Sequence, residues 1–159
     1  MNAVGAIIVA AFAILWVVAG TRQLGRVWFA SLLLLALLIS GSLIFVAGFI
    51  PYAARSGRFD GKTYGIFVVL EAIAIVIAVV LLNCTRRKQY LIPIIAFIVG
   101  VHFFGMVPAL HSNDFWWVGG AMCVLPLLTM SILPQKAWAP VVGMGCALIL
   151  WLSALRAFF

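Results

Sequence analysis

The sequence predicts an all-α protein, a bundle of about six transmembrane helices that forms a single domain over residues 1–159. Hydrophobic residues make up 67% of the chain and charged residues 8%, whereas soluble domains average roughly 45–50% and 25%. A chain of this length has too little interior to bury so much apolar surface in water. The surrounding solvent is therefore predicted to be lipid. The apolar stretches are continuous, which favours helices over the alternating pattern of a membrane barrel.

Six apolar stretches come close to the length of about 20 residues that a helix needs to cross a bilayer. They are residues 3–20, 28–50, 65–83, 90–110, 116–133 and 137–155. The first stretch lacks the positively charged start of a signal peptide, so we expect it to be retained as a helix. The fifth stretch is short, and the alternative is therefore a five-span chain with a re-entrant segment among the last two stretches.

Basic residues gather in the connections between these stretches, and the formal net charge is +7. The connections after the first, third and fifth stretches hold six basic residues: Arg22, Arg26, Arg86, Arg87, Lys88 and Lys136. The remaining four lie at the other face, so the positive-inside rule favours an orientation with both chain ends outside. We then expect the excess positive charge to set the orientation of the chain in the membrane and to contact lipid headgroups. No nucleic-acid partner is expected.

Two ionisable side chains, Glu71 and His102, lie deep within apolar stretches. Each is 12 residues from the short connection between the third and fourth stretches. At 1.5 Å per residue, both lie about 18 Å from the same membrane face. An acid in hydrocarbon costs at least about 2.5 kcal/mol, so such groups face the bundle interior and find partners. We expect Glu71 and His102 at matching depth on neighbouring helices, where helix rotation decides whether they face one another.

The residues that follow His102 predict a pocket beside it. Pro108 has no N–H and leaves the Phe104 carbonyl without its helical donor. A kinked helix with a freed carbonyl, next to the small residue Gly105, can form a polar pocket at membrane depth. Gly105 and Pro108 are therefore the predicted pocket-forming residues.

The predicted pair, Glu71 and His102, has two interpretations. It binds a proton or a substrate, because the charge states of both groups respond to burial and to each other. Alternatively, it is a structural hydrogen bond that fixes helix packing. A hydrated cavity that reaches Glu71 would favour the first interpretation, and a dry packed contact would favour the second.

Several glycines predict close contacts between helices, either within the chain or in an oligomer. The set consists of Gly41, Gly48, Gly119, Gly120, Gly143 and Gly145. Small residues at these positions allow two backbones to approach each other more closely than larger side chains would.

The chain shows no signature of catalysis or of cofactor binding. It contains no HExxH, GxSxG or Walker-type motif, which are typical of several enzyme classes. Its cysteines, Cys84, Cys123 and Cys146, are widely spaced and form no CxxC, so no disulfide framework or metal site is expected. His111 lies near a membrane surface, far in depth from His102, so no haem site is expected. The sequence predicts a protein that is not an enzyme and holds no cofactor or metal.

The segment IVGVHFFGMVPAL, residues 98–110, resembles a segment of small, uncharacterised bacterial polytopic integral membrane proteins. In those proteins a glycine and a His-Phe pair precede a proline in mid-helix. The matching residues here are Gly100, His102, Phe103 and Pro108, and the proline comes later because Gly-Met-Val intervenes. The resemblance implies a multi-pass protein of the bacterial inner (plasma) membrane and implies no particular activity.

These features predict a small integral membrane transporter or channel-like protein with Glu71 and His102 as its proton- or substrate-responsive site. The alternative is a non-catalytic membrane scaffold or accessory subunit whose apolar faces bind partner helices. The expected partners are the lipid bilayer and either a second copy, which would make a homo-oligomer, or another membrane protein. A lipid-modifying enzyme, the third and least favoured class, would need a polar cleft near Arg86–Lys88 or Arg55–Lys62.

Overall fold

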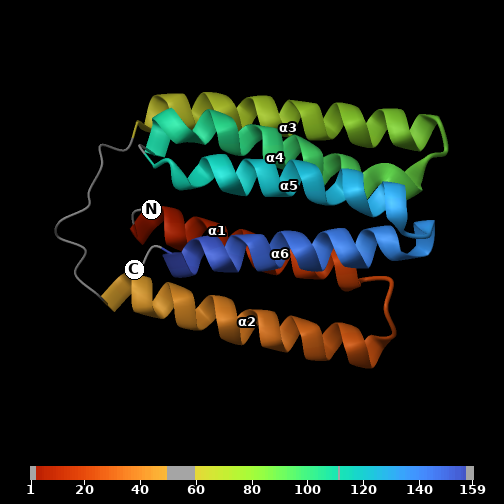
Figure 1. Ribbon diagram of the computed structural model, residues 1–159, viewed down its shortest axis with the longest axis horizontal. Helices are drawn as coiled ribbons and strands as arrows, with labels where there is room; N and C mark the ends of the chain where they lie inside the picture. Colours follow the sequence, from red (N-terminus) through yellow and green to blue (C-terminus); the bar gives the residue numbers. More distant parts are fainter. Residues whose placement is uncertain (1–2, 50–59, 111, 157–159) are drawn as a thin grey trace.

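The computed structural model describes residues 3–49, 60–110 and 112–156, which form six helices that alternate in direction, with no strand among them (Figure 1). The helices are α1 (Ala3–Thr21), α2 (Arg26–Phe49), α3 (Gly61–Cys84), α4 (Leu91–Leu110), α5 (Asp114–Ile132) and α6 (Trp138–Arg156). Short 3₁₀ turns, Lys88–Tyr90 and Gln135–Ala137, precede α4 and α6. The prediction of an all-α helix bundle is confirmed.

Five of these helices, α2 to α6, are long and apolar enough to cross a membrane. In helix α1 the apolar segment found among the described residues is Gly5–Thr21. Helices α5 and α6 are each continuous over 19 residues and both belong to these five, which favours the prediction without a re-entrant segment among the last two stretches; the number of spans stays a prediction. The chain has the architecture of a multi-pass membrane protein.

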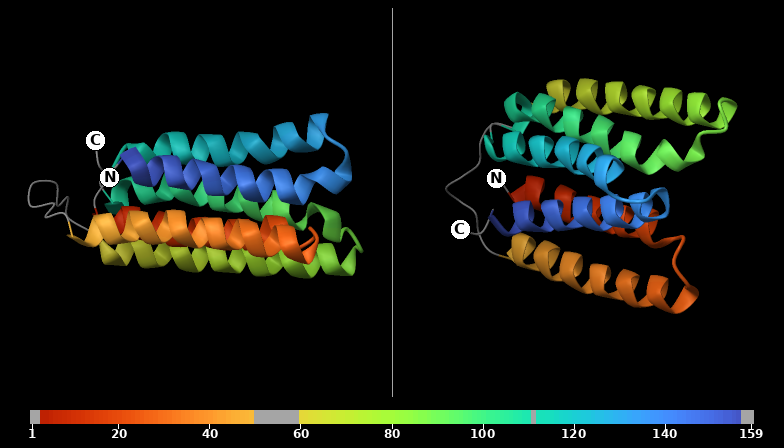
Figure 2. Two further views of the ribbon diagram at one scale, coloured as in Figure 1. Left: turned by 90° about the horizontal axis from the view of Figure 1, so that it is seen from below. Right: turned by 45° about the vertical axis from the view of Figure 1, so that its right-hand side comes forward.

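The six helices pack as two groups of three that do not follow chain order (Figures 1 and 2). Helix α1 packs against α2 and α6, while α4 packs against α3 and α5. The two groups meet mainly through α5 and α4, which both contact α6. Helix α3 lies at the edge of its group and contains no buried residue, whereas α6 lies near the centre of the bundle.

Pairs of glycines bring helices together within each group. A Cβ added to Gly143 of α6 would lie 2.5 Å from the Cα of Gly20 in α1. A Cβ added to Gly119 of α5 would lie 2.8 Å from the carbonyl oxygen of Gly100 in α4. Real Cβ atoms do not approach other atoms so closely, so each contact requires glycine. The close contacts predicted for Gly119 and Gly143 are confirmed.

The other glycines of the predicted set behave differently. Gly41, Gly48 and Gly120 have open space where a Cβ would be, and Gly145 faces the side chain of Leu125. These three open positions make no close contact within the described part of the chain, and a contact there in an oligomer stays a prediction. The rotation of α2 and α5 about their axes turns the sides that carry these three glycines away from neighbouring helices.

The turn between α3 and α4 reverses the chain within a few residues. The N–H of Arg87 donates to the carbonyl of Leu82 (2.9 Å), and that of Arg86 donates to the carbonyl of Asn83 (3.2 Å). Arg86 adopts a positive φ of 57°. This hydrogen-bond pattern is the Schellman motif, in which the positive-φ position favours glycine. The turn places α4 antiparallel to α3 as its direct neighbour.

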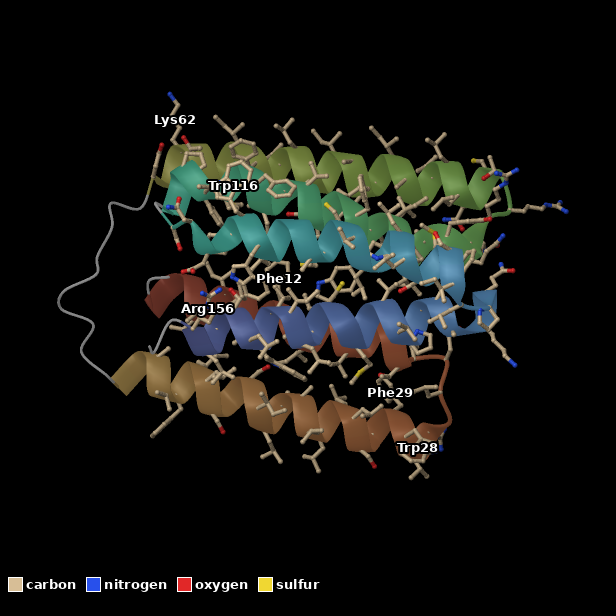
Figure 3. All side chains as sticks on the ribbon, in the orientation of Figure 1. Phe12, Trp28, Phe29, Lys62, Trp116 and Arg156 are labelled. Carbon is tan, nitrogen blue, oxygen red and sulfur yellow. The ribbon has the colours of Figure 1, made fainter. Side chains whose placement is uncertain are left out.

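The two ends of the bundle differ in charge. Lys62 and Arg156 lie at the end where α1 begins and α6 finishes, and Trp28 lies at the opposite end (Figure 3). That opposite end carries the connections after α1, α3 and α5, which hold the six basic residues grouped in the sequence. The structure thus places them on one face, and the assignment of that face to the inside of the membrane stays a prediction.

Candidate functional site

Glu71 of α3 and His102 of α4 face one another in the structure. The Nδ1 atom of His102 lies 3.4 Å from the Oε2 atom of Glu71. The side chains are nearly enclosed, with exposed fractions of 9% for His102 and 12% for Glu71. The matched depth predicted from the sequence therefore comes with a helix rotation that brings the two groups into contact.

Two polar contacts fix the register of α3 against α4. At one end of the pair, the N–H of Asp60 donates to the carbonyl of Ala109 (3.0 Å). Seven residues farther along each helix, the Nδ1 atom of His102 lies 3.1 Å from the carbonyl oxygen of Phe67. Because both contacts belong to one antiparallel register, they hold His102 of α4 opposite a fixed position along α3, the helix that carries Glu71.

The Phe67 carbonyl determines which ring nitrogen of His102 carries hydrogen. A carbonyl oxygen only accepts hydrogen bonds, so Nδ1 must be the donor in this contact. In the neutral ring, the Nε2 atom is then an acceptor. The same Nδ1 atom is 3.1 Å from the Phe67 carbonyl oxygen and 3.4 Å from the Oε2 atom of Glu71. The imidazole is thus oriented by a backbone atom, whatever the protonation state of Glu71.

The predicted pocket-forming residues have other places in the structure. Gly105 faces the ring of Phe67, and a Cβ added there would lie 2.8 Å from the Cζ atom of that ring. Gly105 therefore admits the Phe67 ring and lets α3 approach α4. Pro108 is exposed and lies within the continuous helix α4. Neither residue lines the cavity described next, because both lie on other faces of α4.

A cavity of about 80 Å³ adjoins the Glu71–His102 pair. Its walls come from four helices and are mostly aliphatic and aromatic: Gly5, Ile8, Val9, Phe12, Tyr64, Val68, Glu71, Val99, His102, Phe103, Met106 and Phe115. Phe12 of α1 lies between the two helix groups (Figure 3). The cavity therefore lies between the group that contains α1 and the group that contains α3 and α4.

The cavity is elongated along the helices. Its lining residues extend from Gly5 to Phe12 in α1 and from Tyr64 to Glu71 in α3. Each interval is seven residues, which corresponds to about 10 Å of helix. Gly5 and Tyr64 are in the first turn of their helices. The cavity thus extends from the end of the bundle where α1 begins to the polar pair at mid-depth.

The contribution of α1 is the part of the site that the sequence did not predict. Four lining residues, Gly5, Ile8, Val9 and Phe12, belong to this helix. All are ordinary residues of an apolar segment, and nothing in the sequence separates them from residues that face lipid. The backbone carbonyl of Phe67 was also missed, because every residue carries such a group.

No metal centre forms in residues 3–49, 60–110 and 112–156, where no three His, Cys, Asp or Glu side chains gather around one point. The thiol of Cys123 lies 3.7 Å from the carbonyl of Phe97, and Cys146 is buried in the core. Comparison with known proteins found no matching family model, no matching curated protein and no matching solved structure. The function therefore has to be inferred from the site itself.

Proposed function

We propose that the protein is a small membrane transporter or channel-like protein in which Glu71 and His102 form a proton- or substrate-responsive site. The observation that supports this most is the cavity that extends from one end of the bundle to this pair. A purely structural pair would be expected to lie in dry, filled packing. A cavity beside an ionisable pair at membrane depth is typical of a binding site.

The chemistry of the pair suits reversible binding of a proton. The Glu71 carboxylate and the Nε2 atom of a neutral His102 are both acceptors. A charge change on one group alters the energy of the other, because the two groups lie 3.4 Å apart in surroundings that screen charge poorly. The Phe67 carbonyl holds the ring in place while such a change occurs.

The packing of the bundle suits a change of access to the site. Glycine contacts hold α1 to α6 in one group and α4 to α5 in the other. The cavity lies between the two groups, where α1 faces α3 and α4. A rocking motion of one group against the other would change which end of the bundle the cavity approaches, as in many transporters.

Proton flux into proteoliposomes, followed with an internal pH-sensitive dye, tests the proposal. We expect flux in the wild type, alone or with a panel of small solutes, and its loss in Glu71→Gln and His102→Asn. Asn retains a donor for the Phe67 carbonyl and lacks an ionisable ring. Asp114→Asn, which removes an acid at a helix end, is the control and should keep its flux.

The decisive comparison requires that all variants remain folded, as judged by thermal unfolding in detergent. Equal flux in the wild type and in Glu71→Gln would refute the proposal. Absence of flux under every condition, together with a lower unfolding temperature for Glu71→Gln, would support the second candidate function.

That second candidate is a non-catalytic scaffold or accessory subunit. The observation that favours it is α3, which has no buried residue and presents apolar side chains such as Ile66, Val69 and Ile73 to its surroundings. Such a face would bind a partner helix or a second copy of the chain. Under both candidates we propose that the protein belongs to the bacterial inner membrane, on the strength of the resemblance at residues 98–110.

A further inference from the structure

We propose that the cavity beside Glu71 takes a small organic cation, an amine in its ammonium form; this inference rests on the proposed function of the Glu71–His102 site. Three features of the cavity wall support this ligand class. They are the charge of the wall, the placement of its acceptors and the size of the space.

The charge of the wall favours a cation over an anion. Glu71 is the acid among the lining residues, and none of the lining residues is Lys or Arg. An anion would lie beside the carboxylate without a positive partner, which is costly away from water. An ammonium group would instead supply the positive partner and form a charge-assisted hydrogen bond with the Glu71 carboxylate.

The acceptors of the wall match a group with several N–H donors. His102 donates through Nδ1 to the Phe67 carbonyl, so its Nε2 atom is left as an acceptor in the neutral ring. An ammonium group carries up to three donors and can serve both Glu71 and His102. A metal ion would find too few ligands here, because no cluster of three ligating side chains occurs among the described residues.

The remaining wall matches the hydrocarbon part of an amine. Phe103 and Phe115 stack with ring centroids 5.7 Å apart, and Phe12 contributes from α1. Aromatic faces attract organic cations, and the aliphatic side chains of Val68 and Val99 accept an alkyl group. The cavity is about 80 Å³, against about 150 Å³ for a dry cavity that holds benzene. By this comparison the space holds a ligand of about three non-hydrogen atoms, such as ethylamine.

Binding of radiolabelled ethylamine to the protein in lipid nanodiscs tests this inference, with ethanol as the neutral ligand of the same shape. Empty nanodiscs give the background from partitioning into lipid. We expect the amine to bind at least about tenfold more tightly than the alcohol, because the charged hydrogen bond is available only to the amine. Glu71→Gln should remove this preference.

Two further variants test whether the amine binds in this cavity. Ile8→Phe fills the cavity from α1 without altering the polar pair and should weaken binding of the amine at least about tenfold. Asp114→Asn removes an acid outside the cavity and should leave binding unchanged. All variants should be compared only after their unfolding temperatures show that they are folded.

The outcomes separate this inference from the proposed function. Equal binding of amine and alcohol, or an amine preference that survives Glu71→Gln, would overturn the inference, and so would an absence of amine binding. If amine-free proton flux still depended on Glu71 in that case, the proposed function would stand alone. Amine binding that depends on Glu71, without flux of protons or amine, would support the ligand class and contradict transport.

Discussion

Replacement of Gly143 by alanine should destabilise the bundle by forcing α1 and α6 apart. The added Cβ would lie 2.5 Å from the Cα of Gly20 and 2.7 Å from the carbonyl oxygen of Trp16. Both are backbone atoms, which no side-chain rotation can move. Ordinary contact at about 3.4 Å or more requires that the two helices separate by about 1 Å.

The magnitude follows from the extent of this interface. A gap of 0.5–1 Å forfeits about a quarter to a half of the dispersion energy at each atomic contact, and overpacking typically costs about 1–3 kcal/mol. The α1–α6 contact is the most extensive between helices in the bundle, so we expect the upper part of this range. The free energy of unfolding of Gly143→Ala should therefore fall by about 2–3 kcal/mol.

Reversible unfolding by SDS titration in mixed micelles, followed by circular dichroism, measures this change. The matched control is Gly120→Ala, a mid-helix glycine of α5 with nothing within 4 Å of the added Cβ. That variant should be neutral or slightly more stable, because alanine favours helix over glycine by up to about 1 kcal/mol. Equal stability of Gly143→Ala and Gly120→Ala would refute the close approach of α1 to α6.

Two other substitutions test local structure. Trp151→Phe removes the buried hydrogen bond from Nε1 to the Ser40 hydroxyl (2.9 Å) and should lower the unfolding free energy by about 1–2 kcal/mol. The same substitution should cost less in a Ser40→Ala background, and an equal loss in both backgrounds would contradict the pairing. Arg86→Gly relieves the positive φ at the end of α3 and should raise the unfolding temperature by the equivalent of about 1 kcal/mol, whereas Arg87→Gly, at a φ of −103°, should not.

The sequence determined the helices and the depth of the polar pair because those follow from length and spacing. Continuous apolar stretches of near-membrane length fix where helices run, and the short connection between α3 and α4 makes these helices neighbours. The matched depth of Glu71 and His102 depended only on counting residues from that connection. Their contact additionally required a helix rotation that spacing alone does not specify.

The walls of the cavity could not be predicted for a related physical reason. In water, a helix marks its buried face by apolar residues, but in lipid both faces are apolar and the pattern carries little information. Ile8 and Phe12 therefore resemble lipid-facing residues. Gly105 was predicted to form a pocket beside His102, whereas in the structure it faces the Phe67 ring on α3.

The placement of Glu71 on the outlying helix α3 has a consequence for how the chain enters the membrane. Helix α3 alone would expose this carboxyl group to hydrocarbon, at a cost of about 2.5–3.5 kcal/mol for a charged residue at mid-depth. The next helix to be synthesised, α4, brings the imidazole of His102 to within 3.4 Å of it. Only residues 85–90 separate the two helices. We therefore expect α3 and α4 to insert together, as a hairpin, because this would shield the acid from lipid.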